Sequence, residues 1–370
     1  MFRSLFRQAW LLLASTFSPS LLSGAVPSLD SVLETIRDKN NVPALAGAIF
    51  TPNGVVEMAA VGVRKRGTEV PVTTHDLWHL GSDTKAMTAT VLGTYVAEGR
   101  VSWQDKVVSF FPRLGERVSP EMRRITLAQV LSHTAGLPEN LDWRELARHG
   151  NLRQQRLHAV AEALTHPALP VGTYHYANTD YVLIGAVLEK LGDKPWEELI
   201  RERLFRPLHM SSAGFHGTGT LGVIDQPWPH LADGQPAPLN GPMMDNPEVM
   251  GPAGTVHCDM ADWAKFLIDQ LKGGSGFPAM LPNSIYEAMQ TAQPGCHYGF
   301  GWSVTSRPWA GGKALNHAGS NTMNVANTWL APNRKFGVLV CTNQGGPAAQ
   351  KAADEAVGAL IRRHEAAVKK

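Results

Sequence analysis

Apolar residues follow two different periods along the chain. Near the N-terminus, apolar positions at helical spacing predict a helix over residues 28–40, and two apolar runs follow it at 44–51 and 55–63. Pro52, Asn53 and Gly54 separate these runs, so we expect a β-hairpin. Strand patterns return late, at 298–304, 324–331 and 335–343, before a last helical segment over 348–367.

The middle of the chain has helical periodicity instead. Helices are predicted over 85–99, 126–133, 179–192 and 260–274, and several of these segments end in glycine, which is common just beyond a helix C-terminus. Residues 211–252 are rich in glycine and proline and predict long surface loops. The whole pattern indicates an α+β fold: an antiparallel sheet built from both chain ends with terminal helices packed on it, plus an inserted, mainly helical domain.

The expected domain boundaries follow from this pattern. The sheet domain comprises residues 26–75 and 296–370, the helical domain comprises residues 76–295, and the active site is expected between them. Residues 1–25 have a basic start, a short apolar core and small residues up to Ala25, the layout of a secretory signal peptide. We therefore expect a periplasmic or secreted protein without stable membrane insertion, with an uncleaved N-terminal anchor as the alternative.

Composition excludes some classes of function. The chain has 370 residues and a net charge of +2, and its basic residues are scattered, so we expect no nucleic-acid partner. Cys258, Cys296 and Cys341 form neither a disulfide framework nor a thiolate metal site, although one pair could bridge. Because the chain also lacks an HExxH motif, we expect no metal and no other cofactor.

The stretch HLGSDTKAMTA, residues 79–89, contains the first candidate for chemistry. Ser82 and Lys85 lie three residues apart and would share one face of a helix. In the first turn, free N–H groups and the helix dipole favour negative charge on or near Ser82. Lys85 lies in an otherwise apolar segment, and burial lowers the pKa of a lysine and allows it to act as a base. A helix start that happens to carry a lysine is the alternative.

Two later stretches complete a pattern. Tyr176-Ala177-Asn178 precedes a predicted helix, and His317-Ala318-Gly319 lies at the start of a predicted late strand. SxxK, YxN and a basic residue-x-Gly, in this order, resemble the serine β-lactamase and penicillin-binding-protein superfamily. The branch that the chain most resembles contains class C β-lactamases, D-alanyl-D-alanine carboxypeptidases, D-aminopeptidases and family VIII esterases. The resemblance extends from about Leu29 to Leu360.

The resemblance implies a role for each motif residue. Ser82 would be the nucleophile that forms an acyl-enzyme, and Lys85 and Tyr176 would transfer its protons, Tyr176 also activating the water for deacylation. Asn178 would position Lys85 or a substrate amide. The third motif, His317 to Gly319, would border the substrate, and the backbone N–H groups of Ser82 and Ser320 would form the oxyanion hole.

Each of these side chains also has a purely structural interpretation. Tyr176 could be a packing tyrosine, Asn178 a helix cap and His317 a satisfied histidine at a strand end. His133, in the stretch TLAQVLSHTAGLP, is expected to be structural, hydrogen-bonded under the rim of the active site.

The third motif departs from the family pattern, which usually has lysine where this chain has His317. Histidine is largely neutral at pH 7 and attracts a substrate carboxylate less than lysine does. We therefore expect a serine hydrolase for small esters, amides or short peptides. A β-lactamase or D-alanyl-D-alanine carboxypeptidase proper is one alternative. A slowly deacylating or non-catalytic protein that binds cell-wall peptides is an alternative of another class.

Overall fold

A six-stranded antiparallel sheet contains strands from both ends of the chain. In the computed structural model, which describes residues 27–238, 240–241 and 244–369, the strand order is β2-β1-β9-β8-β7-β6. The strands are β2 (Gly54–Gly62), β1 (Ala44–Thr51), β9 (Phe336–Thr342), β8 (Val325–Ala331), β7 (Gly312–Ser320) and β6 (Ser303–Arg307). This arrangement confirms the predicted fold class. The predicted signal peptide lies outside the described residues.

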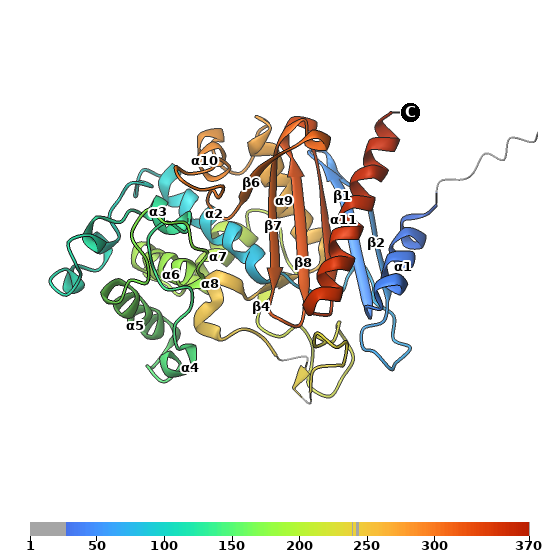
Figure 1. Ribbon diagram of the computed structural model, residues 1–370, viewed down its shortest axis with the longest axis horizontal. Coiled ribbons are helices and arrows are strands. Elements are labelled where there is room, and N and C mark those ends of the chain that lie inside the picture. The colour runs from blue at the N-terminus through green and yellow to red at the C-terminus, as the bar shows by residue number, and fades with distance from the viewer. Residues whose placement is uncertain (1–26, 239, 242–243, 370) are drawn as a thin grey trace, which may run out of the picture.

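The two faces of the sheet pack against different helices (Figure 1). The terminal helices α1 (Leu29–Asn40) and α11 (Gly346–Val368) cover one face, where Leu45 and Ile49 of β1 are buried among their apolar residues. Ala46 and Ala48 belong to the larger core on the other face, together with residues of α9 (Met260–Gly274). Strand β1 is apolar on both sides because it is buried on both sides.

The middle of the chain is mainly helical. Its longest helices are α6 (Asn178–Gly192) and α9, followed by α2 (Thr84–Ala97) and α5 (Leu152–Thr165). Helix α2 is buried at every position from Thr84 to Tyr95, and its sequence accordingly consists of apolar and small residues apart from Lys85 and Tyr95. The shorter elements are α3 (Leu127–Leu131), α4 (Trp143–Leu146), α7 (Trp196–Ile200), α8 (Gly251–Gly254), α10 (Asn283–Met289) and a small sheet of β3 (Trp78–His79), β5 (Val256–Cys258) and β4 (Gly214–Phe215).

The apolar pattern did not predict several elements, of which β7 and α5 are the longest. Strand β7 was missed, and the His317 motif, expected at the start of a late strand, lies near the end of β7. Polar residues interrupt the pattern there, among them Asn316, whose amide nitrogen donates to Asn327 on β8. Helix α5 was missed because Gln155 and Arg156 lie on its buried face.

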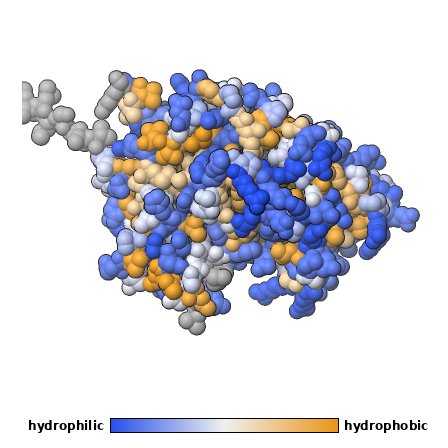
Figure 2. All heavy atoms as spheres, turned by 180° about the vertical axis from the view of Figure 1, so that it is seen from behind, coloured by the Kyte–Doolittle hydropathy of each residue, from blue (hydrophilic) through white to orange (hydrophobic). Residues whose placement is uncertain are grey.

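The surface is predominantly polar. Figure 2 shows the face opposite to that of Figure 1, where charged and polar residues surround scattered apolar ones. Of the helices in the described residues, none combines the length and the apolar character needed to cross a membrane.

A buried arginine joins the helices of the middle segment. Arg156 on α5 pairs with Glu189 on α6 at 2.6 Å and with Glu197 on α7 at 2.5 Å. It also donates to the carbonyl oxygens of Glu248 and Val249, both at 3.2 Å, just before α8. Arg156 thereby fixes the position of the segment that leads into α8.

Substitution of this arginine is expected to destabilise the fold strongly. In Arg156→Met, both carboxylates lose their partner in buried surroundings, so we expect the free energy of unfolding to fall by about 3–5 kcal/mol. Urea denaturation measures the change. Arg148→Met, which breaks the exposed pair with Glu145, is the control and should leave the midpoint unchanged. Equal midpoints for the two variants would contradict the role given to Arg156.

Candidate active site

Ser82 lies in a tight turn between a short strand and the buried helix α2. A single turn of 3₁₀ helix, Gly81–Asp83, leads from β3 into α2. Ser82 is partly exposed, whereas Gly81 and Asp83 on either side are buried. The turn thus presents the Ser82 side chain to solvent at the start of a helix, as the sequence predicts.

Lys85 is fully buried one turn further along. Its Nζ lies 3.1 Å from Ser82 Oγ, 2.8 Å from Asn178 Oδ1 and 2.9 Å from the carbonyl oxygen of Ala253. The structure therefore brings Ser82, Lys85 and Asn178 together, along with Ala253 of α8, which sequence reasoning missed. A backbone carbonyl leaves no signature in a sequence, so nothing in the pattern pointed to it.

The two carbonyl oxygens decide how the protons of Lys85 are arranged. Both oxygens can only accept hydrogen bonds, so each takes one N–H of Lys85. In the neutral amine this leaves one lone pair, directed at Ser82 Oγ. Burial lowers the pKa of Lys85 to about 7, and any negative charge on Asp180 or Asp83 would oppose this shift. A neutral amine that can accept the Ser82 proton is therefore accessible near neutral pH.

Tyr176 lies beside the amine of Lys85. The centre of its ring is 4.8 Å from Lys85 Nζ. Burial raises the pKa of the Tyr176 phenol well above its usual range, and hydrogen bonding with Ser82 opposes this shift only in part. The phenol therefore stays protonated, which suits a proton donor or relay better than a free base.

Asn178 is the first residue of α6, and its side chain does not cap the helix. Its Oδ1 accepts from Lys85, and its Nδ2 donates to Asn140 Oδ1 at 2.9 Å. The contact with Asn140 orients the amide so that its oxygen faces Lys85. Asn140 is a second residue that the sequence did not identify.

His317 is buried, with only 4% of its surface exposed. Its Nε2 lies 2.8 Å from the hydroxyl of Tyr298, and burial lowers its pKa to about 3. The ring therefore stays neutral, in line with the expectation for histidine at this position. It contacts Tyr298, a residue that sequence reasoning missed, instead of forming an open cationic surface.

The backbone around the third motif lies directly against the Ser82 turn. A β-carbon on Gly319 would be 1.9 Å from the carbonyl oxygen of Leu80 and 2.9 Å from the backbone nitrogen of Ser82. A β-carbon on Gly81 would be 2.4 Å from the nitrogen of Ser320. The N–H groups of Ser82 and Ser320 are thus brought close together, as an oxyanion hole requires.

A buried histidine supports the same turn. The backbone N–H of Gly81 donates to His79 Nδ1 at 3.1 Å, and His79 Nε2 lies 2.5 Å from Asp245. Because Nδ1 accepts the N–H of Gly81, Nε2 carries the ring proton, and it lies beside the carboxyl group of Asp245. His79 lacked any motif that could have identified it.

The described residues contain no cluster of three or more histidine, cysteine, aspartate or glutamate side chains that could hold a metal ion. Cys258, Cys296 and Cys341 are free thiols.

Comparison with known proteins identifies the family. The Beta-lactamase family model matches residues 29–362, so the chain belongs to this family. The chain is 26% identical to penicillin-binding protein 4 of Amycolatopsis lactamdurans over 84% of either chain. It is 22% identical to protein flp of Staphylococcus aureus, over 87% of this chain but only 64% of the staphylococcal protein.

Solved structures show the same fold. A penicillin-binding protein homologue from Pyrococcus abyssi, described as octameric, matches with a TM-score of 0.73 and 23% identity, over 90% of this chain and 77% of the other. D-alanine carboxypeptidase AmpC from Burkholderia cenocepacia matches with a TM-score of 0.70 and 19% identity, over 90% and 97% of the chains. Family and fold together indicate serine hydrolase chemistry through an acyl-enzyme.

Alanine at position 319 is expected to disrupt the site. In Gly319→Ala, the new β-carbon must push the Ser82 turn away from β7, and loss of one oxyanion donor costs about 10²–10³-fold in rate. We therefore expect acylation of Ser82 by an activated ester to slow by at least about 10²-fold. Stopped-flow release of p-nitrophenol measures this rate. Gly358→Ala on α11, where only the Arg362 side chain is near, should leave it unchanged.

Proposed function

We propose that the protein is a serine hydrolase that cleaves ester or amide bonds through an acyl-enzyme, with Ser82 as the nucleophile and Lys85 as its base. The observation that carries this proposal is the set of contacts made by the Lys85 amine. Two acceptors that cannot donate direct its lone pair at Ser82 Oγ, 3.1 Å away. The lowered pKa of Lys85, about 7, supports the same role.

The reaction follows from these positions. As Ser82 Oγ attacks the substrate carbonyl, its proton moves to Lys85 Nζ, and the N–H groups of Ser82 and Ser320 stabilise the oxyanion. When the intermediate collapses, the bond to the leaving group breaks, and this group takes a proton from Lys85 through the Tyr176 phenol. Water then attacks the acyl-enzyme and loses its proton along the same route, and Ser82 is released with its proton restored.

His317 and Tyr298 bear on the choice of acyl group. A neutral, buried histidine held by a tyrosine hydroxyl offers no fixed positive charge to a substrate carboxylate. Substrates without a carboxylate are therefore favoured, such as short esters and neutral amides, over β-lactams and peptides with a free C-terminus. We further propose that the substrate is a small molecule or short peptide met in the periplasm or outside the cell.

The pH dependence of labelling tests the role of Lys85. A fluorophosphonate probe should label Ser82, and the second-order rate should rise with pH through about 7, because the protonated amine cannot accept the serine proton. Labelling followed by gel fluorescence from pH 5 to 9 measures this rate. Ser82→Ala should remain unlabelled. Equal labelling of wild type and Ser82→Ala would refute the proposal.

A panel of three substrates tests the acyl preference. We expect Ser82-dependent turnover to favour p-nitrophenyl butyrate and D-alanyl p-nitroanilide over nitrocefin by about 10- to 100-fold in kcat/KM, because the carboxylate of nitrocefin lacks a charge-assisted partner. Efficient turnover of nitrocefin with negligible ester hydrolysis would refute this preference. If the fluorophosphonate label on Ser82 is lost slowly and none of the three substrates is turned over, a sensor that binds cell-wall peptides would be favoured instead.

A further inference from the structure

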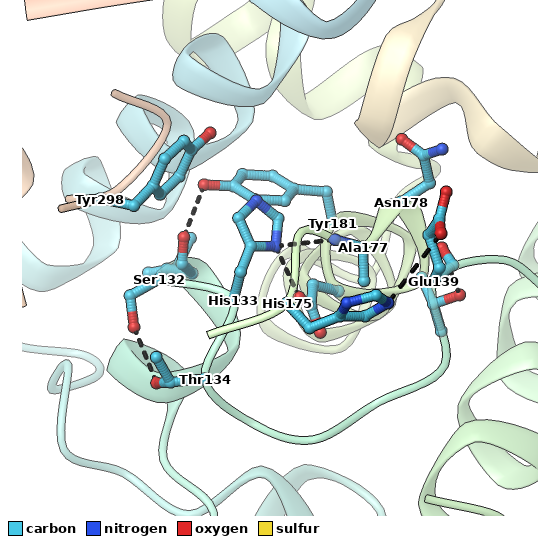
Figure 3. A network of polar contacts seen from close by, with 12 residues as sticks. Ser132, His133, Thr134, Glu139, His175, Ala177, Asn178, Tyr181 and Tyr298 are labelled. Carbon is cyan, nitrogen blue, oxygen red and sulfur yellow. Dashed lines mark hydrogen bonds and ion pairs between the residues drawn. The ribbon is translucent and has the colours of Figure 1, made fainter. Parts of the chain in front are cut away.

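One residue holds the Tyr176 segment on both sides. Residues 173–177 form neither helix nor strand, so their own backbone does not fix the position of the phenol. The N–H of His175 donates to the carbonyl oxygen of His133 at 2.8 Å, and the N–H of Ala177 donates to His133 Nδ1 at 3.2 Å (Figure 3). The centres of the His133 and Tyr176 rings are 4.5 Å apart. His133 thus contacts Tyr176 and both of its neighbours.

The backbone of His133 is itself unusual. Its φ angle is +61°, in the left-handed region, and its side chain is buried. Residues other than glycine rarely adopt this conformation, and where they do the strain is often linked to function. Here the conformation directs both the carbonyl oxygen and the ring of His133 towards the Tyr176 segment.

The nitrogen Nδ1 of His133 lies within hydrogen-bond distance of two groups, and it either carries a proton and donates or has a lone pair and accepts. The N–H of Ala177 needs a lone pair on this nitrogen. Asp180 Oδ2 lies 2.6 Å from the same atom, so in this arrangement Asp180 carries the proton and donates it to Nδ1. Both side chains are buried, and burial raises the pKa of Asp180 and lowers that of His133. The pair is therefore uncharged.

Charged and titratable groups from five parts of the chain surround the pair: α2, the 173–177 segment, α6, β7 and the segment before β6. They are Lys85, Tyr174, His175, Tyr176, Tyr181, Tyr298 and His317. Among them, Lys85 is sensitive to the charge of Asp180: a carboxylate there would stabilise the protonated amine and raise the pKa of Lys85. An uncharged Asp180 instead leaves the Lys85 amine available as a base.

We propose that His133 and Asp180 are positioning residues that form an uncharged clasp, in which Asp180 donates to His133 and His133 sets the Tyr176 phenol beside Ser82 and Lys85. This inference rests on the proposed function, because it assumes that Tyr176 relays protons for Ser82. It assigns to a buried histidine and aspartate a role in turnover beyond the stability of the fold.

Two substitutions separate the parts of the clasp. Asp180→Asn keeps the shape of the side chain and a donor for His133, but it can never be charged. We expect it to keep kcat within about threefold of wild type, because one neutral donor replaces another, and to leave the acid limb of the kcat/KM profile in place.

His133→Asn tolerates the left-handed backbone and retains an acceptor but removes the ring. We expect it to lower kcat by about 10- to 100-fold through misplacement of Tyr176, with little change in KM.

Hydrolysis of p-nitrophenyl butyrate from pH 5 to 9 provides both readouts. Asp269→Asn is the matched control: this buried aspartate accepts from Tyr286 and from the backbone of Met280, so its loss should lower the melting temperature without changing kcat or the pH profile. An acid limb moved to lower pH in Asp180→Asn would show that Asp180 is ionised and overturn the uncharged clasp. A loss of tenfold or more in kcat there would overturn its role as a replaceable donor.

The outcome for His133→Asn decides the positioning role. Reduced thermal stability with unchanged kcat would make His133 merely structural and overturn the inference. If the variant does not fold, Asp180→Asn still decides through its pH profile. Turnover that persists in Ser82→Ala would show that the proposed function is wrong. The ratios of kcat in the His133 and Asp180 variants to kcat in the wild type test only the positioning role, so the two failures can be told apart.

Discussion

The buried amine of Lys85 is the constraint on which the rest of the site depends. A lysine withdrawn from water must satisfy its polar atoms locally, and its three partners come from different parts of the chain: Ser82, Asn178 and Ala253. Each partner needs its own support. Arg156 holds the segment before α8, and Asn140 turns the amide of Asn178. These contacts within the helical segment therefore hold the three oxygen atoms that surround Lys85 Nζ.

How far the sequence predicts this structure depends on whether a feature has a local period or a side-chain motif. The strands at both ends and the helix that follows Ser82 have clear periods, and the order of the three motifs indicates the family. The contact between Ser82 and Lys85 follows from helix geometry alone. By contrast, β7 and α5 place polar residues on buried positions, so the apolar pattern fails there.

Other parts of the site depend on tertiary contacts that no local pattern encodes. The contact with the carbonyl oxygen of Ala253 cannot be predicted from the sequence, because every residue has a backbone carbonyl group. The neutral state of His317 depends on Tyr298 and on burial between distant segments. The sequence indicates which residue types are present, but the state of each group is determined by neighbours that only the fold brings together.

Two buried histidines share one physical solution to the problem of holding a loop. His79 accepts the N–H of Gly81, next to Ser82, and His133 accepts the N–H of Ala177, next to Tyr176, in each case through Nδ1. An aspartate contacts each ring, but at different nitrogens: Asp245 at Nε2 of His79 and Asp180 at Nδ1 of His133. Two similar side-chain pairs therefore differ in geometry: the aspartate of the first pair lies at the nitrogen opposite the accepting one, whereas the aspartate of the second shares the accepting nitrogen with a backbone N–H.

The sheet carries small residues where the Ser82 turn packs against it. Gly319, Ala326, Cys341 and Ala46 lie opposite one another across β7, β8, β9 and β1, so a row of small side chains crosses the sheet. At Gly319 even a methyl group would collide with Leu80 and crowd Ser82. The glycine at position 319 therefore allows the Ser82 turn to approach the strand that carries Ser320. The proximity of the Ser82 and Ser320 backbone nitrogens, which the proposed oxyanion hole requires, is thus a consequence of packing between the helical segment and the sheet.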